Sequence, residues 1–90
     1  MAGARIEIEY CRRCRFQLRA AWLAQEILST FDEDVAEVAL VPSGGGILEI
    51  SVDGEVVASN RGGAMMPDVI DVKRAVRDRV APARKFGHED

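Results

Sequence analysis

The chain has 90 residues, 48% of them hydrophobic, which predicts one small folded domain and excludes a chain that is disordered as a whole. Its 12 basic and 15 acidic residues give a net charge of −3, which argues against nucleic acid as a partner, because nucleic-acid-binding proteins usually carry a basic face. No signal peptide is readable and no apolar run approaches the roughly 18 residues of a membrane helix, so we expect a cytoplasmic protein with no membrane partner.

The chain begins with a predicted strand over residues 5–10 and continues with a predicted helix. In the strand, polar and apolar residues alternate, so Ile6, Ile8 and Tyr10 fall on one buried face. From residue 16 to residue 31 the apolar residues recur at spacings of three and four, as in an amphipathic helix. The predicted core stripe of this helix consists of Ala20, Leu23, Ala24, Ile27, Leu28 and Phe31, with Phe16 in phase.

Between these two elements lies Cys11-Arg12-Arg13-Cys14, which holds the only two cysteines of the chain. Two thiols at this spacing can close and reopen a disulfide across one turn, which is typical of thiol–disulfide exchange sites. Free N–H groups at the helix start and the guanidinium groups of Arg12, Arg13 and Arg15 should favour a thiolate and lower its pKa. By the usual rule for this motif at a helix start, Cys11 is the more exposed, attacking thiol and Cys14 resolves the mixed disulfide.

Two other interpretations of the cysteines remain, a zinc site and a pair of unreactive thiols. One Cys-x-x-Cys pair supplies two ligands, whereas structural zinc usually has four. The only histidine, His88, lies in the predicted tail of the chain. We therefore predict no bound metal, with a zinc-bridged dimer as an alternative.

The middle of the chain predicts three more strands. Residues 35–41 are mostly apolar, which favours a strand buried on both faces, and a break follows at residues 42–46. Residues 47–52 and 55–59 flank Asp53-Gly54, which is typical of a two-residue hairpin turn because both positions tolerate positive φ.

A second helix is predicted to begin with Pro67, to have Asp68 near its positive end and to end before Pro82. Residues 83–90 are expected to fray, which leaves one domain over residues 1–82. The order is β-α-β-β-β-α, with a parallel pair of strands around the first helix and antiparallel strands at the hairpin. The predicted fold class is therefore α/β, an α+β sandwich with a mixed sheet and the layout of a minimal thioredoxin fold.

Other residues are candidates for contact with a substrate or partner. Phe16 and the segment Met65-Met66-Pro67 are predicted contacts beside the cysteines, with core or loop packing as the alternative. Leu18 and Trp22 lie one helical turn apart and point about 180° away from the core stripe, which suggests a partner or homo-oligomer surface, with coverage by neighbouring packing as the alternative. Residues 60–63 are further candidates for seating a small thiol ligand.

The run from Ile8 to Cys14, followed by the helical run Leu18–Leu28, resembles the selenoprotein W-like (Rdx) family. The likeness continues in residues 38–42 and 52–56 and covers nearly the whole chain. It implies a thioredoxin-like fold and a thiol-based redox role. Members with selenocysteine carry it at the position of Cys14, which implies that Cys14 is the reactive residue. The order in which the two cysteines attack therefore stays open.

The chain departs from the pattern of this family at two places and from that of thioredoxins at a third. Many bacterial members carry tryptophan where this chain has Phe16, and the segment before Pro67 is often Gly-Phe where this chain has Ala64-Met65-Met66. Residues 44–46 are glycines at the place where thioredoxins have a cis-proline facing the cysteines.

These observations predict a thiol–disulfide redox protein that acts on glutathione-type or protein disulfides. No bound cofactor is expected; glutathione is an expected thiol donor, and thioredoxin-type proteins are expected partners. The alternative is a non-enzymatic, redox-sensitive interaction domain, in which Leu18 and Trp22 bind a partner and the thiols only modulate the affinity.

Overall fold

The computed structural model describes residues 3–83 of the chain, so residues 84–90 of the predicted tail lie outside the described range. Four strands and two α-helices follow one another in the predicted order, β-α-β-β-β-α, with a short 3₁₀ turn before each helix. The elements are β1 (Ala4–Cys11), η1 (Arg12–Cys14), α1 (Phe16–Thr30), β2 (Val35–Ser43), β3 (Leu48–Val52), β4 (Glu55–Ser59), η2 (Arg61–Gly63) and α2 (Val69–Val80).

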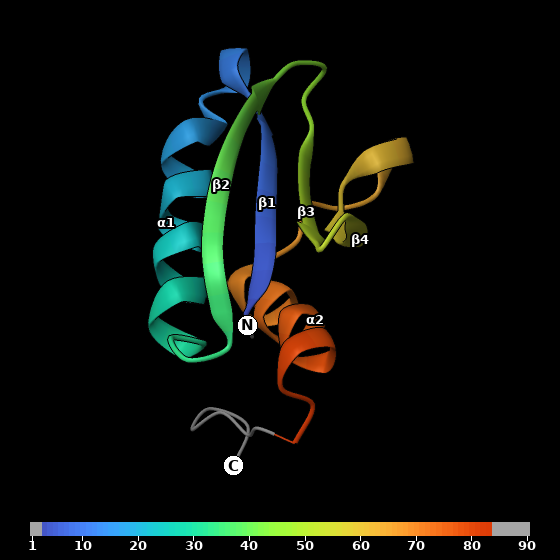
Figure 1. The fold of residues 1–90 in the computed structure, drawn as a ribbon. Coiled ribbons are helices and arrows are strands. Elements are labelled where there is room, and N and C mark those ends of the chain that lie inside the picture. The colour runs from blue at the N-terminus through green and yellow to red at the C-terminus, as the bar shows by residue number, and fades with distance from the viewer. Residues whose placement is uncertain (1–2, 84–90) are drawn as a thin grey trace.

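The four strands form one mixed sheet in the order β2-β1-β3-β4 (Figure 1). β1 pairs in parallel with β2, to which it is connected through α1, and antiparallel with β3. The Asp53-Gly54 turn, with φ of 50° and 88°, joins the antiparallel strands β3 and β4 and confirms the predicted hairpin. The structure therefore confirms the predicted α+β architecture, consistent with a thioredoxin-like fold.

Both helices pack on the same face of the sheet, so the molecule has two layers. Along β1, Ile6 and Ile8 are completely buried beneath the helices, whereas Glu7 on the opposite face is only half-buried. An ion pair of 2.8 Å between Lys73 of α2 and Glu26 of α1 joins the two helices. The hydrophobic core lies between the helices and one face of the sheet, and the other face is polar.

β2 differs from its prediction because it is an edge strand. Only Val35 is buried and Leu40 is exposed, so the expectation of burial on both faces is wrong. β2 is the last strand in the sheet, with β1 on one side only, and the helices cover just one of its faces. The strand also continues through Pro42 and Ser43 instead of breaking before them, since an edge strand tolerates a proline that cannot donate a hydrogen bond.

The helices differ from their predictions at two positions. Leu28 is exposed, although its spacing predicts a place in the core stripe. It lies on the flank of α1 opposite Glu26, the residue that faces α2, and within residues 3–83 no helix covers that flank. Pro67 precedes α2 instead of beginning it, because Asp68 is the N-cap and its carboxylate accepts a hydrogen bond from the N–H of Asp71 at 2.8 Å.

Candidate functional site

The two cysteines lie on either side of the short connection between β1 and α1. Cys11 is the last residue of β1, Cys14 is the last residue of η1, and α1 begins two residues later at Phe16. Arg15 has a φ of 59°, in the left-handed region, and this conformation separates the turn from α1. The pair thus lies near the start of the first helix, as predicted, but Cys11 belongs to β1 and Cys14 to a separate 3₁₀ turn.

The burial of the two cysteines is the reverse of the expected order. Cys11 is 2% exposed, whereas Cys14 is exposed to solvent. Cys11 ends a strand that has neighbours on both sides, and its N–H donates to the carbonyl oxygen of Ile47 at 2.8 Å. The expectation that Cys11 is the more exposed thiol is therefore wrong, because the motif begins inside the sheet and not on the helix.

The two cysteines are free thiols, and each affects the pKa of the other. The hydrogen bond donated by Cys14 is the main cause that lowers the pKa of Cys11; burial opposes this shift, and the backbone N–H groups of Gly46, Arg13 and Cys14 add to it. The same hydrogen bond raises the pKa of Cys14, as do burial and the negative charge on Cys11. The interaction therefore favours negative charge on Cys11 over negative charge on Cys14.

Gly46 is held beside the sulfurs by Asn60, the residue that follows β4. The Asn60 side chain donates to the carbonyl oxygen of Gly46 at 2.8 Å and accepts from the N–H of Leu48 at 2.9 Å. Asn60 thus fixes both ends of the segment 46–48, whose central residue Ile47 accepts the hydrogen bond from Cys11. Sequence reasoning missed this role, because the two partners lie 14 and 12 residues away from Asn60 and no local pattern marks them.

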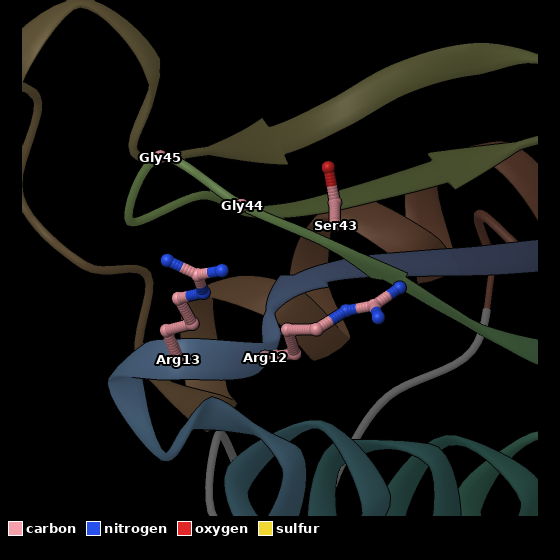
Figure 2. Close-up of a pocket in the computed structure, with 5 residues that line it drawn as sticks. All are labelled: Arg12, Arg13, Ser43, Gly44 and Gly45. Atoms are coloured by element: carbon pink, nitrogen blue, oxygen red, sulfur yellow. The ribbon is translucent and has the colours of Figure 1, made fainter.

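An open pocket of about 390 Å³ adjoins the cysteine turn. It is lined by Arg12 and Arg13 of η1 and by Ser43, Gly44 and Gly45, where β2 ends and the next loop begins. Residue 43 lies next to the turn because the parallel register pairs it with the last residue of β1. Figure 2 shows both arginine side chains extending from the turn toward this wall of strand and loop.

The structure brings only some of the predicted site residues together. Arg12 and Arg13 line the pocket, whereas Arg15 is not among its lining residues. The shifts in the pKa of the two thiols arise from their mutual interaction, from burial and from backbone N–H groups. The predicted effect of the three arginines on the thiol pKa therefore stays a prediction.

The predicted contact residues after the cysteines are mostly packed against the protein itself. Phe16 and Met66 are half-buried against the core, and Pro67 is buried. Met65, by contrast, is 90% exposed. The alternative interpretation, packing against the protein itself, therefore describes Phe16 and Met66. That Phe16 and residues 65–67 contact a substrate or partner stays a prediction.

Leu18 and Trp22 point outward from α1, as their phase in the helix predicts. They are 82% and 45% exposed, respectively. Their use as a partner or homo-oligomer surface stays a prediction.

Two further properties of the described chain bear on its chemistry. Among residues 3–83, no group of three or more His, Cys, Asp and Glu side chains is arranged to hold a metal ion. In the same part of the chain, no helix combines the length and the apolar composition needed to cross a membrane.

Comparison with known proteins gives one family and close structural relatives. A model of the Rdx family matches residues 5–78. A crystal structure of a protein from Bordetella parapertussis is 44% identical, with a TM-score of 0.81, and the match covers 87% of this chain and 99% of that one. A selenoprotein W-related protein from Vibrio cholerae is 43% identical, with a TM-score of 0.79 over 84% of this chain and 95% of that one. A comparison with curated proteins gave no match.

Proposed function

The chain belongs to the Rdx family, and we propose that it is a thiol–disulfide redox protein that works through Cys11 and Cys14. The observation that supports this most is the pair of free thiols at the connection from β1 to α1, the first of which has a lowered pKa. The thiolate is the attacking species in disulfide exchange, so a sulfur that ionises readily favours the reaction. We propose glutathione-type or protein disulfides as the substrates.

We assign the first attack to Cys14 and the resolving attack to Cys11. Cys14 is exposed and can reach the sulfur of a substrate, whereas Cys11, at 2% exposure, cannot. Attack by Cys14 requires the negative charge on its own sulfur, which transfer of its proton to a Cys11 thiolate would supply. Cys11 lies across one turn from Cys14 and is therefore placed to attack the mixed disulfide in the second step. The same choice follows from the resemblance to members with selenocysteine at this position.

The exchange balances with two thiols and one disulfide. The Cys14 thiolate attacks one sulfur of a disulfide RS–SR, which forms a Cys14–SR bond and releases RS⁻. The Cys11 sulfur then attacks Cys14, which forms the Cys11–Cys14 disulfide and releases the second RS⁻. The two protons of the cysteines end on the two released thiols, and two electrons pass from protein to substrate. Glutathione, or the dithiol of a thioredoxin-type protein, restores the reduced pair by the reverse exchange.

Trapping of the mixed disulfide tests both the function and the assignment of roles. Cys11→Ser retains the exposed thiol and should accumulate a mixed disulfide with oxidised glutathione, detected by intact-protein mass spectrometry. Cys14→Ser should accumulate far less, because its remaining thiol is buried. Wild-type protein should proceed to the internal disulfide. The proposal fails if wild-type protein never forms that disulfide, and the assignment of roles fails if Cys14→Ser traps the substrate faster than Cys11→Ser.

A second candidate function is a redox-sensitive interaction domain without catalysis. The exposed pair Leu18 and Trp22 favours it, since large apolar side chains on an outer helix face often anchor a partner. Partners captured equally by wild-type protein and by the double variant with both cysteines changed to serine would support this function. Loss of every partner from that double variant would argue against it.

A further inference from the structure

The two arginines of η1, Arg12 and Arg13, lack the ion pairs that several other arginines of the described chain form. Arg61 forms an ion pair of 2.9 Å with Glu49, and Arg79 pairs with Glu55. Within residues 3–83, neither Arg12 nor Arg13 has a carboxylate within ion-pair distance, and both are exposed. In a chain with more acidic than basic residues, two adjacent guanidinium groups thus keep their full hydrogen-bonding capacity for a group from outside.

The pocket wall opposite the two arginines, formed by residues 43–45, leaves room for a bound group. A Cβ atom added at Gly44 or at Gly45 would have no other atom within 4 Å, so the space above both residues is open. Ser43 adds a hydroxyl group to the same wall, and none of the five lining residues is acidic. The pocket of about 390 Å³ therefore presents hydrogen-bond donors and positive charge around an open space, which is the chemistry that binds carboxylates, sulfonates and phosphates.

The pocket also adjoins the reactive sulfurs on both of its sides. Cys14 belongs to the same 3₁₀ turn as Arg12 and Arg13. On the other side, the parallel register pairs Cys11 with the lining residue Ser43. A substrate whose sulfur meets Cys14 would therefore place its neighbouring groups in or beside the pocket.

We propose that the pocket of Arg12, Arg13, Ser43, Gly44 and Gly45 is a subsite for anions, which selects disulfide substrates with an acidic group a few bonds from the sulfur. This inference rests on the proposed thiol–disulfide exchange and names its substrate class. Guanidinium groups bind carboxylates through paired hydrogen bonds, so the acidic group holds the substrate while Cys14 attacks. A cationic group at the same place would be repelled by both arginines.

Three small disulfides of similar size separate the effect of charge from general reactivity. The probes are 3,3′-dithiodipropionate, which is anionic, bis(2-hydroxyethyl) disulfide, which is neutral, and cystamine, which is cationic. The rate at which each oxidises the reduced wild-type protein is divided by its rate with dithiothreitol. We expect the normalised ratio of the anionic to the cationic probe to be roughly tenfold, the size expected for two partly exposed ion pairs. High salt should reduce this ratio.

Single substitutions then locate the preference. Arg12→Gln and Arg13→Gln should each lower the ratio several-fold. Arg19→Gln is the matched control, because Arg19 is exposed on α1, outside the pocket, and its loss changes the net charge equally. Any change in the thiol pKa affects all three probes alike and cancels in the ratio. An unchanged ratio in both pocket variants, or an equal loss in Arg19→Gln, would overturn the subsite.

A non-reactive probe keeps the subsite testable apart from the exchange reaction. Suberate has the chain length and the two terminal carboxylates of 3,3′-dithiodipropionate, with carbon in place of sulfur. It should shift the NMR signals of the Gly44 and Gly45 amides in wild-type protein and not in the double variant Arg12→Gln/Arg13→Gln. If no disulfide oxidises the protein but suberate binds, the exchange function is wrong and the anion site stands. If exchange proceeds without charge preference and suberate leaves both amides unmoved, the anion site is wrong.

Discussion

Asn60 acts on the cysteines only through the backbone of residues 46–48, so its influence on the thiols can be separated from its contribution to folding. We predict that Asn60→Ala frees this segment and weakens the hydrogen bond from the Gly46 N–H to Cys11. Loss of a donor to the thiolate raises the pKa of Cys11, so the thiolate should form at higher pH than in the wild type. The ultraviolet absorbance of the thiolate, followed during a pH titration, measures this shift.

Ser59→Ala is the matched control for this prediction. Ser59 is the neighbouring residue, and its hydroxyl donates to Glu49 at 2.9 Å on the polar face of the sheet. The substitution should weaken that contact without moving the thiolate titration. Coincident titration curves for Asn60→Ala and wild type would show that Gly46 keeps its place without Asn60.

Glu49 is a largely buried carboxylate whose charge is held by Arg61. The guanidinium group donates to both carboxylate oxygens, at 3.0 and 2.9 Å, and Ser59 donates a further hydrogen bond. The hydrogen bonds from Arg61 are the main cause that lowers the pKa of Glu49; burial opposes the shift, and Ser59 adds to it. Because the folded-state pKa lies below the unfolded one, the resulting stability is present above the ordinary glutamate pKa and is lost as the pH falls through the folded-state pKa.

We therefore predict that Glu49→Gln lowers the free energy of unfolding at neutral pH by about 1–2 kcal/mol, the range of a charged hydrogen bond with one exposed partner. The difference between the variant and the wild type should shrink as the pH falls below the ordinary range of glutamate. Urea unfolding at a series of pH values measures it. A difference that stays constant down to acid pH would contradict the role given to this carboxylate.

At the residue scale, the sequence predicts which side chains carry the chemistry but not how they are arranged. The spacing of Cys11 and Cys14 marks them as a redox pair without any structure. Their relative burial depends on the neighbours of β1, which come from distant parts of the chain. The same limit hides Asn60, whose partners belong to another strand and its preceding loop.

α2 begins two residues later than its sequence predicts, at Val69 instead of Pro67. Asp68 has an extended backbone and accepts the N–H of Asp71, so helical geometry starts only at Val69. We predict that Asp68→Ala destabilises the fold by about 1 kcal/mol, the usual effect of losing an N-cap side chain. Asp68→Asn, which retains the acceptor, should recover most of this loss in urea unfolding. Equal stability of Asp68→Ala and wild type would show that the cap contributes nothing.

The elements were predictable where a local rule decides them. Asp53-Gly54 needs positive φ at both positions, and the structure has it there. The alternation along β1 likewise follows from one buried face. The apolar run of β2 is ambiguous, because an edge strand beneath a helix and a central strand covered on both faces both favour such residues. Only the strand order, which is a property of the assembled sheet, resolves this ambiguity.

The stability of the whole molecule depends on one core between the helices and the sheet. Phe31 is completely buried where α1 turns into β2, whereas Leu28 on the same helix is exposed. We predict that Phe31→Ala lowers the free energy of unfolding by about 3–5 kcal/mol, the range for deleting a buried aromatic side chain. In a domain of this size that is a large part of the total stability.

Leu28→Ala is the control for this prediction, because periodicity alone places both residues in the core. It should lower the free energy of unfolding by less than about 1 kcal/mol. Thermal and urea unfolding of the two variants, compared with wild type, measure the difference. Similar losses for both would mean that Leu28 is covered by a part of the chain or by a second molecule.

The architecture of the whole molecule follows from the order of its elements, but its pocket does not. A parallel pair around a helix, followed by a hairpin and a second helix, allows few arrangements. The pocket combines Arg12 and Arg13 with residues 43–45, which are about thirty positions away, and these segments meet because the register pairs Cys11 with Ser43. No local sequence pattern in either segment predicts that the two lie next to each other.

The left-handed Arg15 has a consequence for how the two redox states would be distinguished. Since it sets the 3₁₀ turn apart from α1, a covalent link between positions 11 and 14 changes a four-residue stretch and leaves sheet and helices in place. We therefore expect the dithiol and disulfide forms of the protein to have nearly the same backbone structure outside this stretch. A protein that reduces the disulfide would then have to distinguish the two forms by direct contact with the sulfurs, because the rest of the surface would be the same in both.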